Sequence, residues 1–380
     1  MSDDARLRLA FIADPNSLHT RRWIAWFARA GHDVRLIDPF GANIDPGLPN
    51  GVAVERYTAH RSRIPLVALF RSRGQLRRLL ARLDTQVLHA QFVRRFGWQA
   101  AISGFRPRVI SPWGSDILRV PPRAIRTRWW NRFALRSADL ITVSSEGMRD
   151  ASIRAGAHSD RIRLIHHGVD TTTFAPGPPS AEVAARVAAG RQPVIVSPRT
   201  IRPLYRQEVV VDAVAALSTP QRRPVLVLSA RGADPGELAR LRQRAADAGI
   251  GDQLRVLHDI AHDDLPDVFR LADVVVSVPE TDSFAVTLLE AMACGRPLVV
   301  SDVPAVTPVL RRIDPLAGEL VAPVGDAATT AAAIDRALSL STAERERLGA
   351  LLREHVERTA DYDANMAEME RLYRRLAAGR

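Results

Sequence analysis

Short apolar runs alternate with longer amphipathic segments along most of the chain. Residues 8–14 (RLAFIAD) have the length and composition of a buried strand. Residues 20–32 (TRRWIAWFARAGH) place Trp23, Ile24 and Phe27 on one helical face. This alternation predicts an α/β protein with parallel sheets and crossover helices. The further strands that it predicts are 33–38, 86–92, 108–113, 140–145, 193–199, 224–230, 253–259, 274–279 and 297–302, with a closing helix at 364–379.

A segment rich in Thr, Pro and Gly, residues 169–180, interrupts this pattern, which starts again near residue 193. We interpret the segment as a linker between two doubly wound domains, a division that suits a chain of 380 residues. The first domain is expected at 1–172 with a closing helix at 362–380, and the second at 173–361. Ligands of open parallel sheets bind beyond the carboxyl ends of the strands, so a cleft between the domains is the expected site.

The composition is typical of a soluble globular protein, with 46% hydrophobic and 25% charged residues. An apolar run of about 18 residues is absent from the sequence, so no membrane span is predicted. The first residues lack the basic start and the long apolar core of a signal peptide. Cys294 is the single cysteine, which excludes an internal disulfide. We expect a cytoplasmic protein.

The net charge of +11 is unevenly distributed. Residues 1–175 hold 28 Arg against 14 Asp and Glu, whereas the remaining residues hold 25 against 28, and every basic residue is Arg. A one-sided charge indicates an anionic partner for the first half: a phosphorylated or acidic acceptor, an anionic membrane surface, or nucleic acid. Nucleic acid is not expected, because the sequence has no helix-turn-helix, zinc or RNP pattern.

The strongest concentration of basic residues lies at 56–82, with eight Arg and no acid. Within it, apolar Leu66, Phe70, Leu76, Leu79 and Leu80 alternate with Arg71, Arg73, Arg77 and Arg78. A basic amphipathic segment of this kind can lie on an anionic membrane surface. It can equally be a crossover helix packed by its Leu face. We hypothesise that the acceptor is anionic or lipid-linked and that the protein meets it peripherally at the inner membrane face.

Residues 279–300 carry an acid, Glu290, inside a segment that is otherwise apolar. The pattern predicts a helix from Phe284 to Gly295, with Asp282 or Ser283 as its N-cap. A buried carboxylate without a partner costs several kcal/mol. It therefore needs either a distant Arg or a ligand with hydroxyl groups. Because a helix N-terminus favours anions, we expect both acids to face a ligand.

The stretch 282–302 (DSFAVTLLEAMACGRPLVVSD) resembles the signature of family 4 type (group 1) retaining glycosyltransferases of the GT-B fold: an acid, seven residues, then Glu. The resemblance implies two Rossmann-like domains facing across a cleft. It also implies that Asp282 contacts the donor sugar and that Glu290 binds the ribose hydroxyls of the nucleotide. The other expected donor-binding positions are Ser283, Phe284 and Ala285. The family usually has Glu at position 282, and Gly at positions 283 and 285.

Other segments extend the resemblance over some 350 residues. Residues 197–214 (SPRTIRPLYRQEVVVDAV) resemble the first strand and helix of the family's second domain. This match implies that Arg199 and Arg206 stabilise the leaving diphosphate, with Arg202 in reserve. The family needs no metal, and the one Asp-x-Asp triplet, residues 361–363, precedes the last helix rather than following a strand. No cofactor is expected beyond the nucleotide sugar as co-substrate.

The acceptor is expected on the first domain. Residues 113–117 (WGSDI) stand where the family often has His-Gly-x-Asp, so Trp113 replaces the family's His. The acceptor-side candidates are His19, His89, Trp113 and Asp116, with His19 or His89 as a substitute for the missing imidazole. The family's reaction is a front-face transfer, in which the leaving phosphate takes the proton of the acceptor hydroxyl.

Two other functions compete with sugar transfer. One is another GT-B enzyme, a nucleotide-sugar epimerase or a phosphorylase, although neither is expected to carry the acid–seven–Glu element. The other is a non-catalytic protein that uses its basic first half to hold nucleic acid or an anionic lipid surface. A nucleotide-release assay separates the enzymes from the binding protein.

Overall fold

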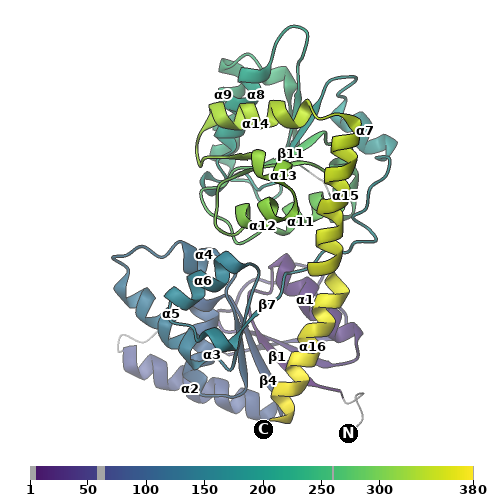
Figure 1. The fold of residues 1–380 in the computed structure, drawn as a ribbon. Helices are drawn as coiled ribbons and strands as arrows, with labels where there is room; N and C mark the ends of the chain where they lie inside the picture. The colour runs from purple at the N-terminus through teal and green to yellow at the C-terminus, as the bar shows by residue number, and fades with distance from the viewer. Residues whose placement is uncertain (1–5, 58–64, 259–260, 380) are drawn as a thin grey trace. The chain divides into compact units, whose positions relative to one another are not determined.

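The computed structural model describes residues 6–57, 65–258 and 261–379, with the backbone alone for 65–70. The chain forms two compact units (Figure 1). Unit 1 comprises Met1–His167 and Asp363–Arg380, and unit 2 comprises Gly168–Tyr362. The predicted boundary at 172/173 falls inside unit 2, because Val169 exchanges backbone hydrogen bonds with Ala360 and Tyr362 and is fully buried there.

The described part of unit 1 is built on a seven-stranded parallel sheet in the order β3-β2-β1-β4-β5-β6-β7. Its strands are β1 (Arg8–Ile12), β2 (Asp33–Asp38), β3 (Val52–Arg56), β4 (Val87–Gln91), β5 (Arg108–Ser111), β6 (Leu140–Val143) and β7 (Ile162–Leu164). Its helices are α1 (Leu18–Arg29), α2 (Pro65–Arg82), α3 (Trp98–Ser103), α4 (Ser115–Leu118), α5 (Ile125–Ser137), α6 (Glu146–Arg154) and α16 (Tyr362–Ala378), with short turns η1 (Val93–Gly97) and η2 (Ser159–Arg161).

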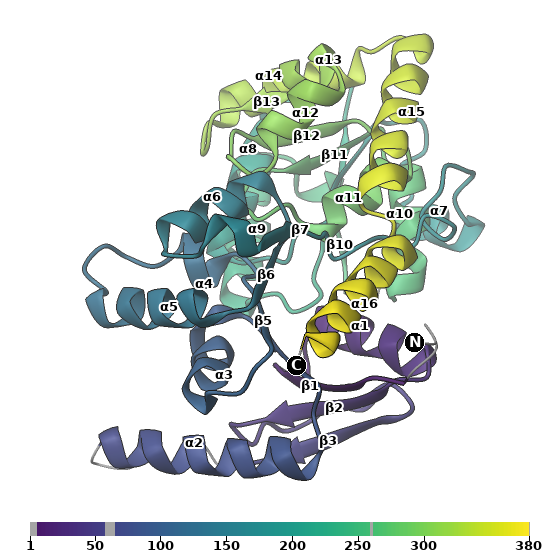
Figure 2. The ribbon, with the colours of Figure 1, turned by 60° about the horizontal axis from the view of Figure 1, so that its bottom comes forward.

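Helices cover both faces of this sheet (Figure 2). Strand β1 shows the arrangement, since successive side chains point to opposite faces. Ala10 and Ile12 belong to the core formed with α2, α3 and α5. Phe11 packs instead against Phe27 of α1 and Tyr373 of α16, with ring centroids 6.0 and 6.3 Å apart. The C-terminal helix thus completes the core of unit 1.

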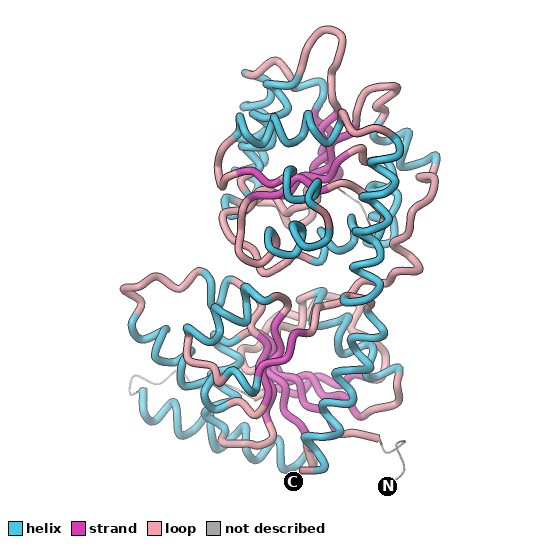
Figure 3. Tube along the Cα trace, viewed as in Figure 1, coloured by secondary structure: helices cyan, strands magenta, loops and turns pink. Residues whose placement is uncertain are grey.

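The described part of unit 2 contains a six-stranded parallel sheet in the order β10-β9-β8-β11-β12-β13. Its strands are β8 (Val194–Ser197), β9 (Val225–Ser229), β10 (Leu254–Leu257), β11 (Val274–Ser277), β12 (Leu298–Ser301) and β13 (Val321–Ala322). Its helices are α7 (Ala181–Val187), α8 (Gln207–Leu217), α9 (Pro235–Asp247), α10 (Leu265–Leu271), α11 (Val286–Ala293), α12 (Thr307–Ile313), α13 (Pro315–Glu319), α14 (Ala327–Leu338) and α15 (Thr342–Thr359), with short turns η3 (Pro203–Tyr205), η4 (Gly251–Gln253) and η5 (His262–Asp264). In each unit the strands form the centre and the helices surround them (Figure 3).

Every strand predicted from the sequence is present, and the strands that were missed, β3, β7 and β13, lie at sheet edges. Edge strands are short and half-exposed, so their apolar signal is weak. Among the described helices, none is both long and apolar enough to cross a bilayer.

The basic segment 56–82 is confirmed as a packed crossover helix over the part described. In α2, Leu76, Leu79 and Leu80 are buried in the core of unit 1, while Arg77 and Arg78 are exposed. The hypothesis that this apolar face lies on a membrane is therefore wrong for these three leucines, because they are already used by the core. The side chains of Leu66 and Phe70 lie outside the described residues.

Candidate functional site

Arg199 and Asp282 form a buried ion pair at the carboxyl edge of the unit 2 sheet. They follow β8 and β11, which are neighbours in the sheet. Arg199 Nη1 lies 2.9 Å from Asp282 Oδ2, and the side chains are 9% and 3% exposed. Neither atom makes a well-aligned hydrogen bond within the described residues. A buried pair with unused hydrogen-bonding capacity is a place where a polar ligand can bind.

Local contacts hold Arg199 in place. Its guanidinium carbon lies 4.3 Å from the centre of the Tyr205 ring, a cation–π distance. The Gln207 side chain donates to the Arg199 carbonyl at 2.9 Å and accepts from the Ser197 hydroxyl at 2.8 Å. Sequence reasoning missed the buried Gln207, although a polar residue opening the apolar helix α8 is the same signal that identified Glu290.

The predicted N-cap at Asp282 or Ser283 is wrong. Helix α11 begins at Val286 with Ala285 as its N-cap, and the methyl side chain of Ala285 provides no capping hydrogen bond. Asp282 Oδ1 instead accepts from the backbone N–H of Ser283 at 2.7 Å, which leaves Oδ2 for Arg199. The helix starts late because Phe284 has a left-handed backbone, with φ of 76°, that an α-helix does not accommodate.

The positions between Asp282 and the helix divide between core and surface. Phe284, one of the predicted donor-binding positions, is 2% exposed and belongs to the unit 2 core, so its side chain is not available for that role. Ser283 and Ala285 are partly exposed, so the donor-binding roles predicted for them stay predictions. The left-handed turn at Phe284 directs the large ring inward, and only its backbone remains for a ligand.

Glu290 is 2% exposed in the middle of α11, as the sequence predicted. The sequence predicts a ligand or a distant Arg as its partner. An ionisable neighbour among the described residues is His262, whose Nε2 lies 4.0 Å from Glu290 Oε1. His262 opens η5, just after the edge strand β10, and its side chain is 27% exposed. Sequence reasoning missed His262, and its place after a strand end is the signal that could have found it.

Arg206 and Arg202 lie on the loop between β8 and α8. Arg206 Nε is 2.9 Å from Glu208 Oε1, and its side chain is 37% exposed. A methyl group added at Gly325 would come within 2.9 Å of Arg206 Nη2, so the guanidinium lies directly against the loop before α14. Arg202 is exposed. Arg206 is thus held on the surface near a glycine turn.

In unit 1, His19, Trp113 and His167 gather at the carboxyl edge of the sheet, after β1, β5 and β7. The rings of His19 and His167 stack with centroids 4.9 Å apart. The Trp113 ring stands edge-on to both, at 5.8 and 5.3 Å. Burial, with the nearby His19, holds the pKa of His167 well below its usual value. His167 Nδ1 is buried and has no hydrogen-bond partner among the described residues.

The acceptor role predicted for His89 is wrong. The side chain is 1% exposed. Its two ring nitrogens form hydrogen bonds with Tyr373 Oη at 2.5 Å and with Ser111 Oγ at 2.7 Å. Burial lowers the pKa of His89 to about 3. His89 is a neutral core residue that ties β4 to β5 and α16.

This burial predicts acid sensitivity. The pKa of His89 is about 3 in the folded state against an ordinary 6.5, so the stability it contributes is complete above pH 6.5 and declines as pH falls toward 3. Between pH 7.5 and pH 5 the loss should be about 2 kcal/mol. Urea unfolding of the wild type and of His89→Gln at both pH values measures it. An equal pH dependence in the two proteins would contradict the assignment.

Asp116 is also a structural residue rather than an acceptor contact. Its carboxylate is fully buried and accepts backbone N–H groups of Val93 at 2.6 Å, Gly114 at 3.0 Å and Trp113 at 3.1 Å. Burial raises the pKa of Asp116 to about 6, against the opposing effect of these hydrogen bonds. Asp116 therefore shapes the turn that presents Trp113, and His167, which sequence reasoning missed, takes its place among the acceptor-side candidates.

Both units match known family models. Residues 181–354 match the family described as glycosyl transferases group 1, and residues 8–145 match glycosyl transferase 4-like. Among curated proteins, the chain is 33% identical over 228 residues to a D-inositol 3-phosphate glycosyltransferase of Saccharomonospora viridis, covering 58% of this chain and 52% of that one. A protein of the same name from Streptomyces bingchenggensis is 32% identical over 259 residues, covering 63% and 55%. The chain thus spans about half the length of the curated relatives it matches.

Solved structures resemble the fold over nearly the whole chain. A glycosyltransferase from Rickettsia africae superposes with a TM-score of 0.81 at 14% identity, covering 98% of each chain. A sucrose-phosphate synthase from Thermosynechococcus elongatus gives 0.79 at 22% identity, covering 99% and 100%. Anabaena HepE, solved with UDP-glucose, gives 0.75 at 18% identity, covering 95% and 98%. These likenesses confirm the two-domain fold that the sequence resemblance implied.

Proposed function

Because the chain belongs to the group 1 glycosyltransferases, we propose that it transfers a sugar from a nucleoside diphosphate sugar to a hydroxyl of an acceptor, with retention of anomeric configuration and without a metal ion. The observation that carries this proposal is the buried pair of Arg199 and Asp282, followed by Glu290 inside the apolar helix α11. These residues lie in the segments that follow two neighbouring parallel strands, where ligands of such sheets bind.

Each donor-side residue has a separate task. Asp282 Oδ2 accepts from a hydroxyl of the donor sugar. Glu290 accepts hydrogen bonds from the two ribose hydroxyls. His262 Nε2 lies 4.0 Å from Glu290 Oε1, close enough to interact with the carboxylate. Arg199 and Arg206 stabilise the negative charge that builds on the diphosphate as its bond to the sugar breaks. Fixed cations aimed at developing charge are among the largest contributions to catalysis.

In the proposed reaction the acceptor oxygen forms a bond to the anomeric carbon on the face from which the diphosphate departs. The C–O bond to the diphosphate breaks, and its electron pair stays on the leaving oxygen. That oxygen takes the proton of the acceptor hydroxyl, so no protein carboxylate has to act as a nucleophile. Unit 1 binds the acceptor, with His19, Trp113 and His167 at its sheet edge as the contacting residues.

The acceptor is anionic or lipid-linked in this proposal. The support is the excess of 28 Arg over 14 acids in residues 1–175. The names of the relatives point in the same direction, because D-inositol 3-phosphate carries a phosphate. A nucleotide-release assay tests the proposal by pairing UDP- and GDP-sugars with phosphorylated and neutral polyol acceptors. Acceptor-dependent release of nucleotide supports transfer, whereas the absence of release with every pair would contradict it.

The reaction should proceed in EDTA. Among the residues that the structure describes, no group of three or more His, Cys, Asp or Glu is arranged to hold a metal ion. In this proposal Arg199 and Arg206, rather than a metal ion, stabilise the negative charge on the diphosphate. Turnover should change by less than about twofold when EDTA is added, since these cations already act where charge develops. Complete loss of turnover that magnesium or manganese restores would contradict the metal-free reaction.

A further inference from the structure

Helix α5 exposes an apolar stripe. Ile125, Trp129 and Phe133 are spaced one helical turn apart and are 75%, 60% and 39% exposed. The Trp129 and Phe133 rings stack at 5.8 Å, nearly parallel at 7°. Single exposed apolar residues are ordinary, but a contiguous stripe marks an interaction site.

Basic residues surround this stripe without any acid. Residues 117–136 hold six Arg and no Asp or Glu. All of them are exposed: Arg119, Arg123, Arg126, Arg128, Arg132 and Arg136. Within this window no carboxylate neutralises these charges, so they can attract an external anion. The apolar stripe offers the molecule that carries the anion a surface to bury.

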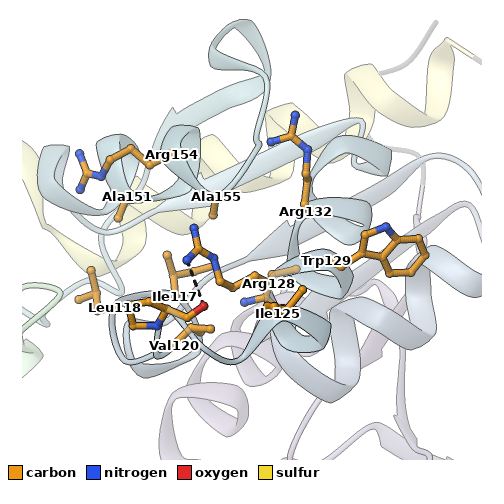
Figure 4. A pocket seen from close by; sticks show the side chains of 12 residues that line it. Ile117, Leu118, Val120, Ile125, Arg128, Trp129, Arg132, Ala151, Arg154 and Ala155 are labelled. Carbon is orange, nitrogen blue, oxygen red and sulfur yellow. Dashed lines mark hydrogen bonds between the residues drawn. The ribbon is translucent and has the colours of Figure 1, made fainter.

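A pocket of about 620 Å³ adjoins the stripe, between α4, α5 and α6. Ile117, Leu118 and the stripe residue Trp129 supply apolar lining, and Arg128 and Arg154 supply charge. Figure 4 shows Arg128 over the middle of the pocket, between the two aliphatic side chains and Trp129. The pocket therefore combines room for an apolar group with cations beside it.

The opposite face of α5 is firmly anchored. Asn131 accepts from the Trp98 indole N–H at 2.9 Å and donates to the Asp116 carbonyl at 2.9 Å. Ala134 and Leu135 are fully buried in the unit 1 core. The exposed stripe thus belongs to a helix held by the core, and the same helix is hydrogen-bonded to the turn that presents Trp113.

We propose that the α5 surface, defined as Ile125, Trp129 and Phe133 with the surrounding Arg residues of 117–136, docks on an anionic lipid bilayer. Trp and other aromatic side chains favour the membrane interface, where one side of the ring is apolar and the other wet. A basic helix face with an apolar stripe binds anionic membrane surfaces through two contributions, the burial of apolar area and the electrostatic attraction to anionic lipids. A soluble phosphate would need the cations but would leave the 60% exposed Trp129 unexplained. This proposal does not depend on which sugar is transferred.

Co-sedimentation of the full chain with vesicles tests it. Vesicles of phosphatidylcholine alone are compared with vesicles containing about 30% phosphatidylglycerol, at about 0.05 and 0.5 M salt. Binding should require the anionic lipid and weaken in high salt. Trp129→Ser should lower the partition coefficient about tenfold, since both the apolar and the charged term are needed. Arg128→Gln with Arg132→Gln should lower it by a similar factor.

The matched control is Arg77→Gln with Arg78→Gln on α2, which removes the same charge from exposed positions elsewhere in unit 1. This control should change the partition coefficient by less than about twofold. Unchanged melting temperatures would show that the variants fold. Equal binding of wild type to neutral and anionic vesicles, full binding by Trp129→Ser, or an equal loss in the α2 control would overturn the proposal. Release of bound protein by inorganic phosphate at constant ionic strength would also overturn it, in favour of a soluble phosphate ligand.

Discussion

Replacing Arg199 by methionine is expected to lower kcat by about 100-fold or more, because removal of one fixed group that stabilises developing charge has effects of this size. The same change should destabilise the protein by about 3–5 kcal/mol, because it leaves the buried carboxylate of Asp282 without its partner. Steady-state kinetics of nucleotide release and urea unfolding measure the two effects.

The double variant Arg199→Met with Asp282→Leu separates structure from catalysis. Replacing both members of a buried ion pair by apolar residues is often neutral or stabilising. We therefore expect the double variant to regain the lost stability but to remain as inactive as the single variant. Recovery of turnover together with stability would show that the pair only maintains the fold. Wild-type turnover in the single variant would remove Arg199 from the site altogether.

Replacing Glu290 by glutamine is expected to weaken donor binding by about 10- to 100-fold, the range for losing hydrogen bonds to a charged group. Glutamine has nearly the same shape, so the packing of α11 is kept. The free energy of unfolding should stay the same or increase, because a charged group is removed from an apolar interior. Calorimetric titration with the nucleoside diphosphate measures the affinity.

The matched control is Glu280→Gln, which removes an exposed acid from the loop that precedes α11. This variant should bind nucleotide as the wild type does. If Glu290→Gln binds with unchanged affinity while remaining folded, Glu290 is a structural residue paired with His262, and the assignment of the ribose site is wrong.

The interior of the fold was predictable because it depends on local pattern. Central strands such as β1 and β11 are continuous apolar runs, since both faces of a parallel sheet are covered. Strands β3, β7 and β13 lack such apolar runs, because they lie at sheet edges and are short or half-exposed, and the pattern therefore did not predict them. The start of unit 2 at Gly168 was also missed, because the packing of Val169 against Ala360 is a contact across nearly 200 residues.

The site was predictable where a residue violates its local pattern. The position of Glu290 in an otherwise apolar helix predicted a buried acid, and in the structure Glu290 is buried. The details that depend on tertiary contacts were not predictable. No local signal places Arg199 beside Asp282, and Phe284 has a left-handed backbone that residue type alone disfavours.

Histidine and carboxylate candidates in unit 1 show the same limit. His89 and Asp116 resemble functional residues in sequence. In the structure, hydrogen bonds with Ser111 and Tyr373 use the ring nitrogens of His89, and backbone N–H groups of residues 93–114 use the carboxylate of Asp116. The amphipathic pattern of α2 and that of α5 are similar in sequence. Only tertiary packing shows that α2 buries its apolar face and that α5 exposes part of its own.

Binding of a nucleoside diphosphate sugar to the donor residues of unit 2 is tested most directly by a thermal-shift screen of the full chain against UDP, GDP, ADP and their sugars. A ligand present at 100 times its Kd stabilises the native state by about 2.7 kcal/mol and so raises the melting temperature. We expect one nucleotide series to raise the melting temperature of the wild type and of Glu280→Gln, with a much smaller rise for Glu290→Gln. No rise with any nucleotide, or the same rise in the Glu290→Gln variant, would contradict the donor site.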